Sequence, residues 1–153
     1  MTELFLPAFN RRSVLGLLAA APLLASARSA AADDLGFGEL YAKYGVLGLE
    51  FSDKVKKLAG REVAIRGFMA PPLKAEAAFF VLTEVPMALC PFCSSDADWP
   101  DNIVVIYLHR KQTFTQANET IEVRGTLDVG SWKDPDTGFV SLLRIRDAAY
   151  QAA

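Results

Sequence analysis

The chain has 153 residues, of which 52% are hydrophobic, and a formal net charge of −2. This length fits one domain, and the apolar content is too high for a disordered chain. A mildly acidic chain lacks the basic surface that nucleic-acid binding requires, so nucleic acid is excluded as a partner. Two cysteines and one histidine limit metal or thiol chemistry to a single small site.

The first 32 residues have the pattern of an export signal. Arg11 and Arg12 form a twin-arginine pair just ahead of an apolar run over 14–25. This run is shorter than the roughly 20 residues needed to span a bilayer. We therefore predict a twin-arginine signal peptide over 1–32, a periplasmic location and no transmembrane segment after cleavage. An ordinary secretory signal that contains the arginine pair is the alternative.

The start of the mature chain predicts a linker followed by one short helix. Residues 33–51 are interrupted by four glycines and are interpreted as a linker segment. Ser52 is a favourable N-cap residue, and Gly60 is a natural helix terminator. These two residues predict a helix over about 52–59.

Five strand signals follow this helix. Each is either a dense apolar run or an alternation of apolar and polar residues, as strands require. The sequence between the last two is rich in Asp, Pro and Gly and predicts a hairpin turn over 133–138. The five predicted strands are 62–69, 77–83, 103–108, 120–129 and 139–145.

Two of these strands contain a glycine in a similar setting, Gly67 and Gly125. Glycine inside a strand usually marks a bulge or a sharp bend. Two bent strands in a set of five suit a small, partly open Greek-key barrel of the OB type. We therefore expect a mainly β fold, with a five-stranded OB-like barrel domain over 52–153 that begins with the short helix. An open sheet or a sandwich is the alternative.

The one local motif that carries chemistry is Cys90-Pro91-Phe92-Cys93, between the second and third predicted strands. Two thiolates at this spacing can supply half of a tetrahedral zinc or copper(I) site. Asp96 and Asp98 follow at once and are the nearest carboxylates that could complete it. The leading hypothesis is a soft-metal site formed by Cys90, Cys93, Asp96 and Asp98.

Two other roles for the cysteine pair stay open. A disulfide would pin the loop and stabilise the fold by about 2 kcal/mol in the chain-entropy model. A dithiol redox site is the other possibility, although the two aspartates would raise a nearby thiol pKa rather than lower it. The chain has no Ser/His/Asp set and no phosphate-binding loop, so we predict a binding module rather than an enzyme.

The remaining polar residues support a few positional expectations. In an OB topology the turn over 133–138 lies at the same end, or pole, of the barrel as the loop that carries Cys90 and Cys93 (the cysteine loop). Asp134 is therefore expected close to this loop. His109 ends the third strand and is expected at the opposite pole. Arg144 and Arg146 alternate with apolar residues and are expected on a solvated face.

Part of the chain, from Arg61 to about Leu108, resembles a family of small exported bacterial proteins of unknown function. The likeness is carried by residues 63–73 and 80–82, by the cysteine loop and by residues 100–104. The family's members are often encoded beside ABC transporters, which implies an envelope transporter or another envelope protein as a partner. Relatives hold a Cys and a His in this loop, and Cys93 stands in the second of these positions. The resemblance therefore implies metal ligation rather than a disulfide.

Overall fold

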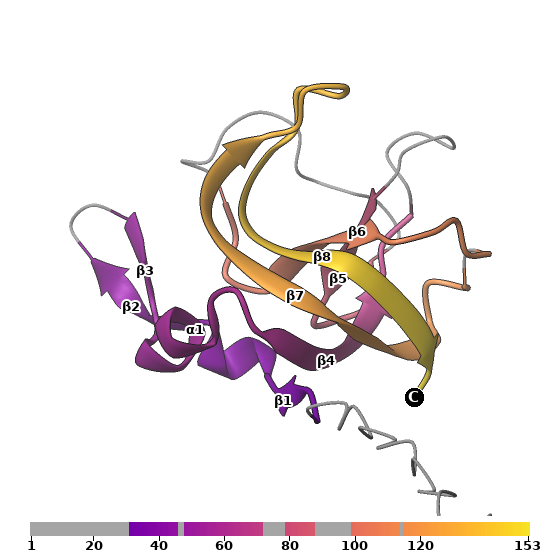
Figure 1. The fold of residues 1–153 in the computed structure, drawn as a ribbon, viewed down its shortest axis with the longest axis horizontal. Helices are drawn as coiled ribbons and strands as arrows, with labels where there is room; N and C mark the ends of the chain where they lie inside the picture. Colours follow the sequence, from indigo (N-terminus) through magenta and orange to yellow (C-terminus); the bar gives the residue numbers. More distant parts are fainter. Residues whose placement is uncertain (1–30, 46–47, 72–78, 88–98, 114) are drawn as a thin grey trace, which may run out of the picture.

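The structure is a computed structural model, and it describes residues 31–45, 48–71, 79–87, 99–113 and 115–153. Strands dominate the described chain, so the predicted mainly β fold is confirmed (Figure 1). In chain order the elements are β1 (Asp33–Asp34), the 3-10 helix η1 (Phe37–Glu39), β2 (Tyr41–Gly45), β3 (Gly48–Phe51), α1 (Asp53–Leu58), β4 (Glu62–Met69), β5 (Phe79–Thr83), β6 (Ile103–Leu108), β7 (Thr120–Lys133) and β8 (Val140–Ala152).

The short helix α1 forms where the sequence predicted it. The Ser52 hydroxyl accepts a hydrogen bond from the backbone N–H of Val55 at 3.1 Å, which is the expected N-cap contact. Gly60 follows the helix with a φ of 76°, a left-handed conformation that glycine adopts without strain. Val55 and Leu58 face the core and attach the helix to the sheet.

All five predicted strands are present, but the last two are longer than predicted. β7 continues past Val129 to Lys133, and β8 continues past Ile145 to Ala152. A register shift between Val129 and Trp132 lets the ladder continue through Gly130, where the alternation of the sequence stops. An extra residue in a bulge interrupts the period of two without ending the strand.

The pairings of the five long strands form a closed circuit. β4 pairs with β5, β5 with β6, β6 with β8, β8 with β7, and β7 returns to β4. Only the β6–β8 pair is parallel among these five pairings. Each of the five strands therefore has a partner on both sides, and β1 adds a short parallel pairing to β4.

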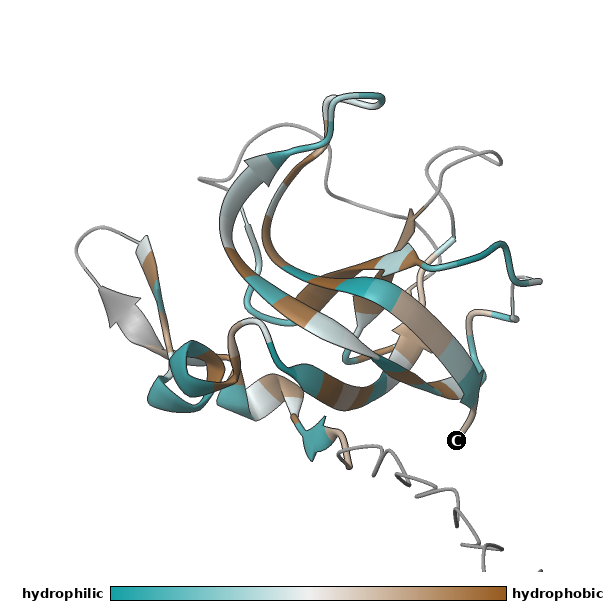
Figure 2. Ribbon diagram, in the orientation of Figure 1, coloured by the Kyte–Doolittle hydropathy of each residue, from teal (hydrophilic) through white to brown (hydrophobic). Residues whose placement is uncertain are grey.

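The core lies between the inner faces of these strands. Apolar and polar residues alternate along β7 and β8, as Figure 2 shows by its brown and teal bands. The largest completely buried side chains are Phe80, Leu35, Leu40, Ile65, Leu82, Ile103, Ile106, Ile121, Leu127, Leu143, Ile145 and Val55. Leu35 and Leu40 come from the predicted linker, so that segment contributes to the core.

The linker segment over 33–51 also contains strands that the sequence analysis did not predict. β2 and β3 form a two-stranded antiparallel hairpin, which projects away from the main sheet in Figure 1. Gly45 pairs with Gly48 across this hairpin, and Gly48 has a φ of 106°. Gly45 and Gly48 therefore face each other at the strand ends of this hairpin, whereas Gly36 and Gly38 lie at the 3-10 helix η1.

Both strand glycines lie where another backbone comes very close. Gly125 sits at a register shift between β7 and β8, so the predicted irregularity is confirmed there. A Cβ on Gly125 would lie 2.6 Å from the carbonyl oxygen of Arg146, and one on Gly67 would lie 2.6 Å from the carbonyl oxygen of Thr83. At both positions the neighbouring strand leaves room only for a hydrogen atom.

Gly125→Ala is expected to lower the free energy of unfolding by about 1–3 kcal/mol, because the added methyl group forces two paired strands apart. The measurement is urea unfolding followed by far-UV circular dichroism. Gly38→Ala is the matched control, since a Cβ at Gly38 meets no atom within 4 Å. A Gly125→Ala protein as stable as the Gly38→Ala protein would contradict the close packing of β7 against β8.

Candidate functional site

The predicted metal ligands Cys90, Cys93, Asp96 and Asp98 lie outside the described residues, as do Arg11 and Arg12 of the predicted export signal. The soft-metal hypothesis and its two alternatives therefore stay predictions. The structure does describe both ends of the connection between β5 and β6 that carries Cys90 and Cys93, here called the cysteine segment (residues 84–102).

Backbone contacts close the base of that segment. Thr83 at the end of β5 pairs with Ile103 at the start of β6. One residue further out, the N–H of Glu84 donates to the carbonyl oxygen of Asn102 at 3.1 Å. The two ends of the connection between β5 and β6 are therefore held side by side by main-chain atoms.

A side-chain contact holds the downstream end of the cysteine segment. Trp99 is buried, with 7% of its surface exposed, and belongs to the core cluster. Its indole Nε1–H donates to the hydroxyl of Tyr41 in β2 at 2.8 Å. Tyr41 also stacks on Phe51 of β3, with ring centroids 5.4 Å apart. This hydrogen bond therefore joins the unpredicted β2–β3 hairpin to the end of the cysteine segment.

The turn between β7 and β8 was expected to share a pole with the cysteine segment. β8 runs parallel to β6, with Val105 opposite Arg144, so the starts of the two strands lie at one end. The turn itself reaches over β6 toward its other end, where Asp134 bonds to Tyr107 and Phe139 packs against Phe79, so the closeness of Asp134 to the cysteine segment stays a prediction. His109 follows the far end of β6, where its N–H donates to the carbonyl oxygen of Ala148. The only histidine is therefore at the opposite pole, as predicted.

Both carboxylate oxygens of Asp134 are already engaged by hydrogen bonds. Oδ1 accepts hydrogen bonds from the N–H groups of Asp136 at 3.0 Å and Thr137 at 2.7 Å, and from the Thr137 hydroxyl at 2.8 Å. Oδ2 accepts one from the hydroxyl of Tyr107 at 2.9 Å. These contacts shape the turn, so Asp134 has a structural role.

The pKa shifts of Asp134 and Tyr107 agree with a structural role for Asp134. Burial acts to raise the pKa of Asp134, but the Thr137 and Tyr107 donors outweigh it and hold the pKa below its ordinary value. Burial, together with the Asp134 carboxylate, raises the pKa of Tyr107 well above its ordinary range. The carboxylate is therefore ionised and the phenol protonated, which is the state that their hydrogen bond needs.

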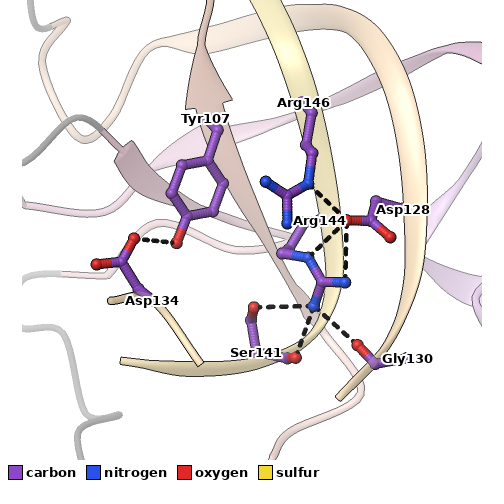
Figure 3. A network of polar contacts seen from close by, with 7 residues as sticks. All are labelled: Tyr107, Asp128, Gly130, Asp134, Ser141, Arg144 and Arg146. Atoms are coloured by element: carbon purple, nitrogen blue, oxygen red, sulfur yellow. Dashed lines mark hydrogen bonds and ion pairs between the residues drawn. The ribbon is translucent and has the colours of Figure 1, made fainter. Parts of the chain in front are cut away.

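Arg144 was expected on a solvated face, and this expectation is wrong. Only 2% of Arg144 is exposed. Its Nε donates to Asp128 Oδ2 at 3.1 Å, and its Nη1 donates to the carbonyl oxygens of Gly130 and Ser141, each at 2.8 Å (Figure 3). The Ser141 hydroxyl accepts a further bond from Nη1 at 3.1 Å.

The bulge in β7 explains why a charged side chain is buried here. Residues in a bulge lose their regular ladder partners, so their carbonyl groups need other donors. Gly130, with a φ of 113°, lies inside the register shift between Val129 and Trp132, and Arg144 donates to its carbonyl oxygen. The guanidinium therefore replaces the hydrogen bonds that the curved ladder lacks.

Arg146 completes the cluster by packing against two aromatic rings. Its Nε donates to Asp128 Oδ2 at 2.5 Å. Its guanidinium carbon lies 4.4 Å from the ring centroid of Trp132 and 5.6 Å from that of Tyr107. The Tyr107 and Trp132 rings meet edge to face, with centroids 5.4 Å apart. Such contacts restrain the guanidinium in one orientation.

Sequence reasoning missed this cluster, although one signal for it was present. Asp128 lies five residues before the predicted turn over 133–138 and Arg144 six residues after it, and the structure has this pair in register. Opposite charges on paired strands are a favourable cross-strand contact. The burial of the pair could not be read from the sequence, because it depends on the bulge.

The described residues contain no group of three or more His, Cys, Asp or Glu side chains that could hold a metal ion. Every buried side-chain nitrogen or oxygen in the same part of the chain has a hydrogen-bond partner. In the described ranges, no helix is long and apolar enough to cross a membrane.

The described structure defines a small, mainly β module with a polar cluster around Tyr107, Arg144 and Arg146. No protein-family model and no curated protein matches the chain. The fold is similar to the crystal structure of a DUF3299 family protein from Pseudomonas aeruginosa PAO1, at a TM-score of 0.52 and 15% identity. The match covers 81% of this chain and 97% of that one. That protein belongs to a family of unknown function, so the likeness supports the fold alone.

Arg144→Met is expected to lower the free energy of unfolding by about 3 kcal/mol, because it leaves buried carbonyl groups without donors. The measurement is urea unfolding at neutral pH. Arg124→Met is the matched control, because Arg124 also contacts a carboxylate from β7 but its side chain is 53% exposed. The control is expected to cost less than about 1 kcal/mol. Equal losses for the two variants would contradict the proposed support of the bulge.

Proposed function

We propose that the chain is an exported OB-like barrel that serves as a binding or accessory module in the cell envelope. The circuit of pairings β4–β5–β6–β8–β7, with one parallel pair, supports an OB-like barrel. The close approaches at Gly67 and Gly125 are consistent with the sharp bends that a small barrel needs.

We further propose that Cys90 and Cys93 bind a soft metal ion, zinc or copper(I). The observation that carries this proposal is the fixed base of the cysteine segment, with Glu84 bonded to Asn102 and Trp99 bonded to Tyr41. A segment with fixed ends restricts the positions that two thiols three residues apart can occupy, which favours binding one ion.

The other ligands of this site would come from the segment itself or from outside the chain. The carboxylate oxygens of Asp134 already accept hydrogen bonds from the turn and from Tyr107. Asp96 and Asp98 are therefore the proposed protein carboxylates, and water or a partner would complete the coordination. An incomplete ligand set suits an accessory module that passes an ion to an envelope transporter, because an open position allows ligand exchange.

The metal proposal is tested with the mature protein purified under reducing conditions. After zinc or copper(I) loading and desalting, metal analysis is expected to give about one ion per chain, which Cys90→Ser/Cys93→Ser loses because thiolates are the strongest ligands. Ser94→Ala/Ser95→Ala is the matched control in the same segment and is expected to keep the metal. Unchanged metal content in the cysteine variant would refute the proposal.

The same preparation separates the two alternative roles. A disulfide that forms with a reduction potential below about −300 mV, with no metal bound, would indicate a structural bridge. Rapid transfer of the disulfide from the oxidised Cys90–Cys93 pair to a reduced substrate dithiol, again without metal, would indicate an oxidoreductase. Either result contradicts metal binding as the function of the pair.

The proposed periplasmic location is tested by changing the arginine pair. In the full-length chain, Arg11→Lys/Arg12→Lys is expected to leave most of the protein as uncleaved precursor in the cytoplasm, since the twin-arginine route depends on both guanidinium groups. Arg28→Lys is the control and is expected to be exported normally. Periplasmic recovery of the double variant at the unchanged level would point to the ordinary secretory route.

A further inference from the structure

Arg146 carries hydrogen-bond donors that the described structure does not use. Its side chain is 37% exposed, so ligands can reach it from solution. Only its Nε has a hydrogen-bond acceptor among the described residues, namely Asp128 Oδ2. The two terminal nitrogens point away from Asp128, on the side of Tyr107, in Figure 3. They form a planar pair of donors with no acceptor in the described chain.

This donor pair is held in place before any ligand arrives. Asp128 fixes the Nε edge of the guanidinium, and the Trp132 ring lies 4.4 Å from its central carbon. The Tyr107 ring centroid lies 5.6 Å from the same carbon, and the Tyr107 hydroxyl is itself bonded to Asp134. A restrained guanidinium loses less side-chain entropy on binding than a free one does.

The charges around Arg146 select the kind of anion. Burial acts to raise the pKa of Asp128, but Arg146 and Arg144 hold it below its ordinary value. Asp134 is also ionised, so the two arginines are balanced by two carboxylates. A dianionic phosphate would meet the repulsion of both carboxylates, whereas a monoanion needs only one arginine partner. The two terminal N–H donors of Arg146, which lie side by side, match the two oxygens of a single carboxylate.

We propose that the terminal nitrogens of Arg146, backed by Trp132 and Tyr107, form a binding site for one carboxylate group. The carboxylate can come from an acidic side chain of a peptide or from a free small acid, since both present the same two oxygens. This site lies on β8, β7 and β6 and does not depend on Cys90 or Cys93. It therefore stands or falls separately from the proposed metal site.

The test is an NMR titration of the mature protein with labelled arginine side chains. The probes are the blocked tripeptide acetyl-Ala-Asp-Ala-amide, its neutral analogue with Asn in place of Asp, and propionate. Saturable shifts of the Arg146 side-chain nitrogens with the Asp peptide, with propionate or with both are expected, and their relative affinities identify the source. No saturable shift with either acid, or an equal shift with the Asn peptide, would overturn the proposal.

Variants give the second readout. Arg146→Gln is expected to weaken binding of the acidic probe at least tenfold, and Arg146→Lys at least threefold, because lysine keeps the charge but loses the paired donors. Arg110→Gln, beyond the opposite end of β6, is the matched control and is expected to bind normally. Equal weakening in Arg110→Gln would identify a general charge effect and refute the site. If Arg146→Gln fails to fold, the wild-type side-chain shifts still decide.

Discussion

The curved end of the β7–β8 ladder depends on one buried guanidinium. Arg144 lies at the bulge in β7, where Gly130 leaves the regular pairing, and it donates to main-chain oxygens of both strands and to Asp128. A buried charge is tolerated only when its donors are satisfied, and here the acceptors exist because the ladder bends. The bend and the buried charge therefore require each other.

This constraint determines which side chains gather around Tyr107. The bend brings the turn after β7 over β6, where Tyr107 reaches Asp134 and Trp132 covers Arg146. Arg144 then donates its hydrogen bonds to backbone oxygens, while the guanidinium of Arg146 keeps an exposed edge. The proposed metal site and the proposed carboxylate site use different chemistry, one based on sulfur and one on a guanidinium.

The sequence predicted what depends on local patterning. The two strands with the strongest apolar patterns, 62–69 and 103–108, have the bounds of β4 and β6, and Ser52 caps its helix as expected. Patterning failed where tertiary contacts decide. The bulge hides the continuation of β7, the role of Arg144 follows from that bulge, and the β2–β3 hairpin depends on Trp99, which lies far along the chain. The cysteine ligands themselves fall outside the described residues.

The closure between Glu84 and Asn102 has a consequence for how such a scaffold can diversify. Because the two ends are joined by main-chain atoms, the closure itself does not depend on which side chains are inserted between them. Trp99 is the exception, because its indole packs in the core and bonds to Tyr41. Natural selection could exchange that insert, altering which ion or molecule is recognised, while the strands beneath keep their arrangement. A common framework with interchangeable inserts would be one route to distant relatives that share a shape and little sequence.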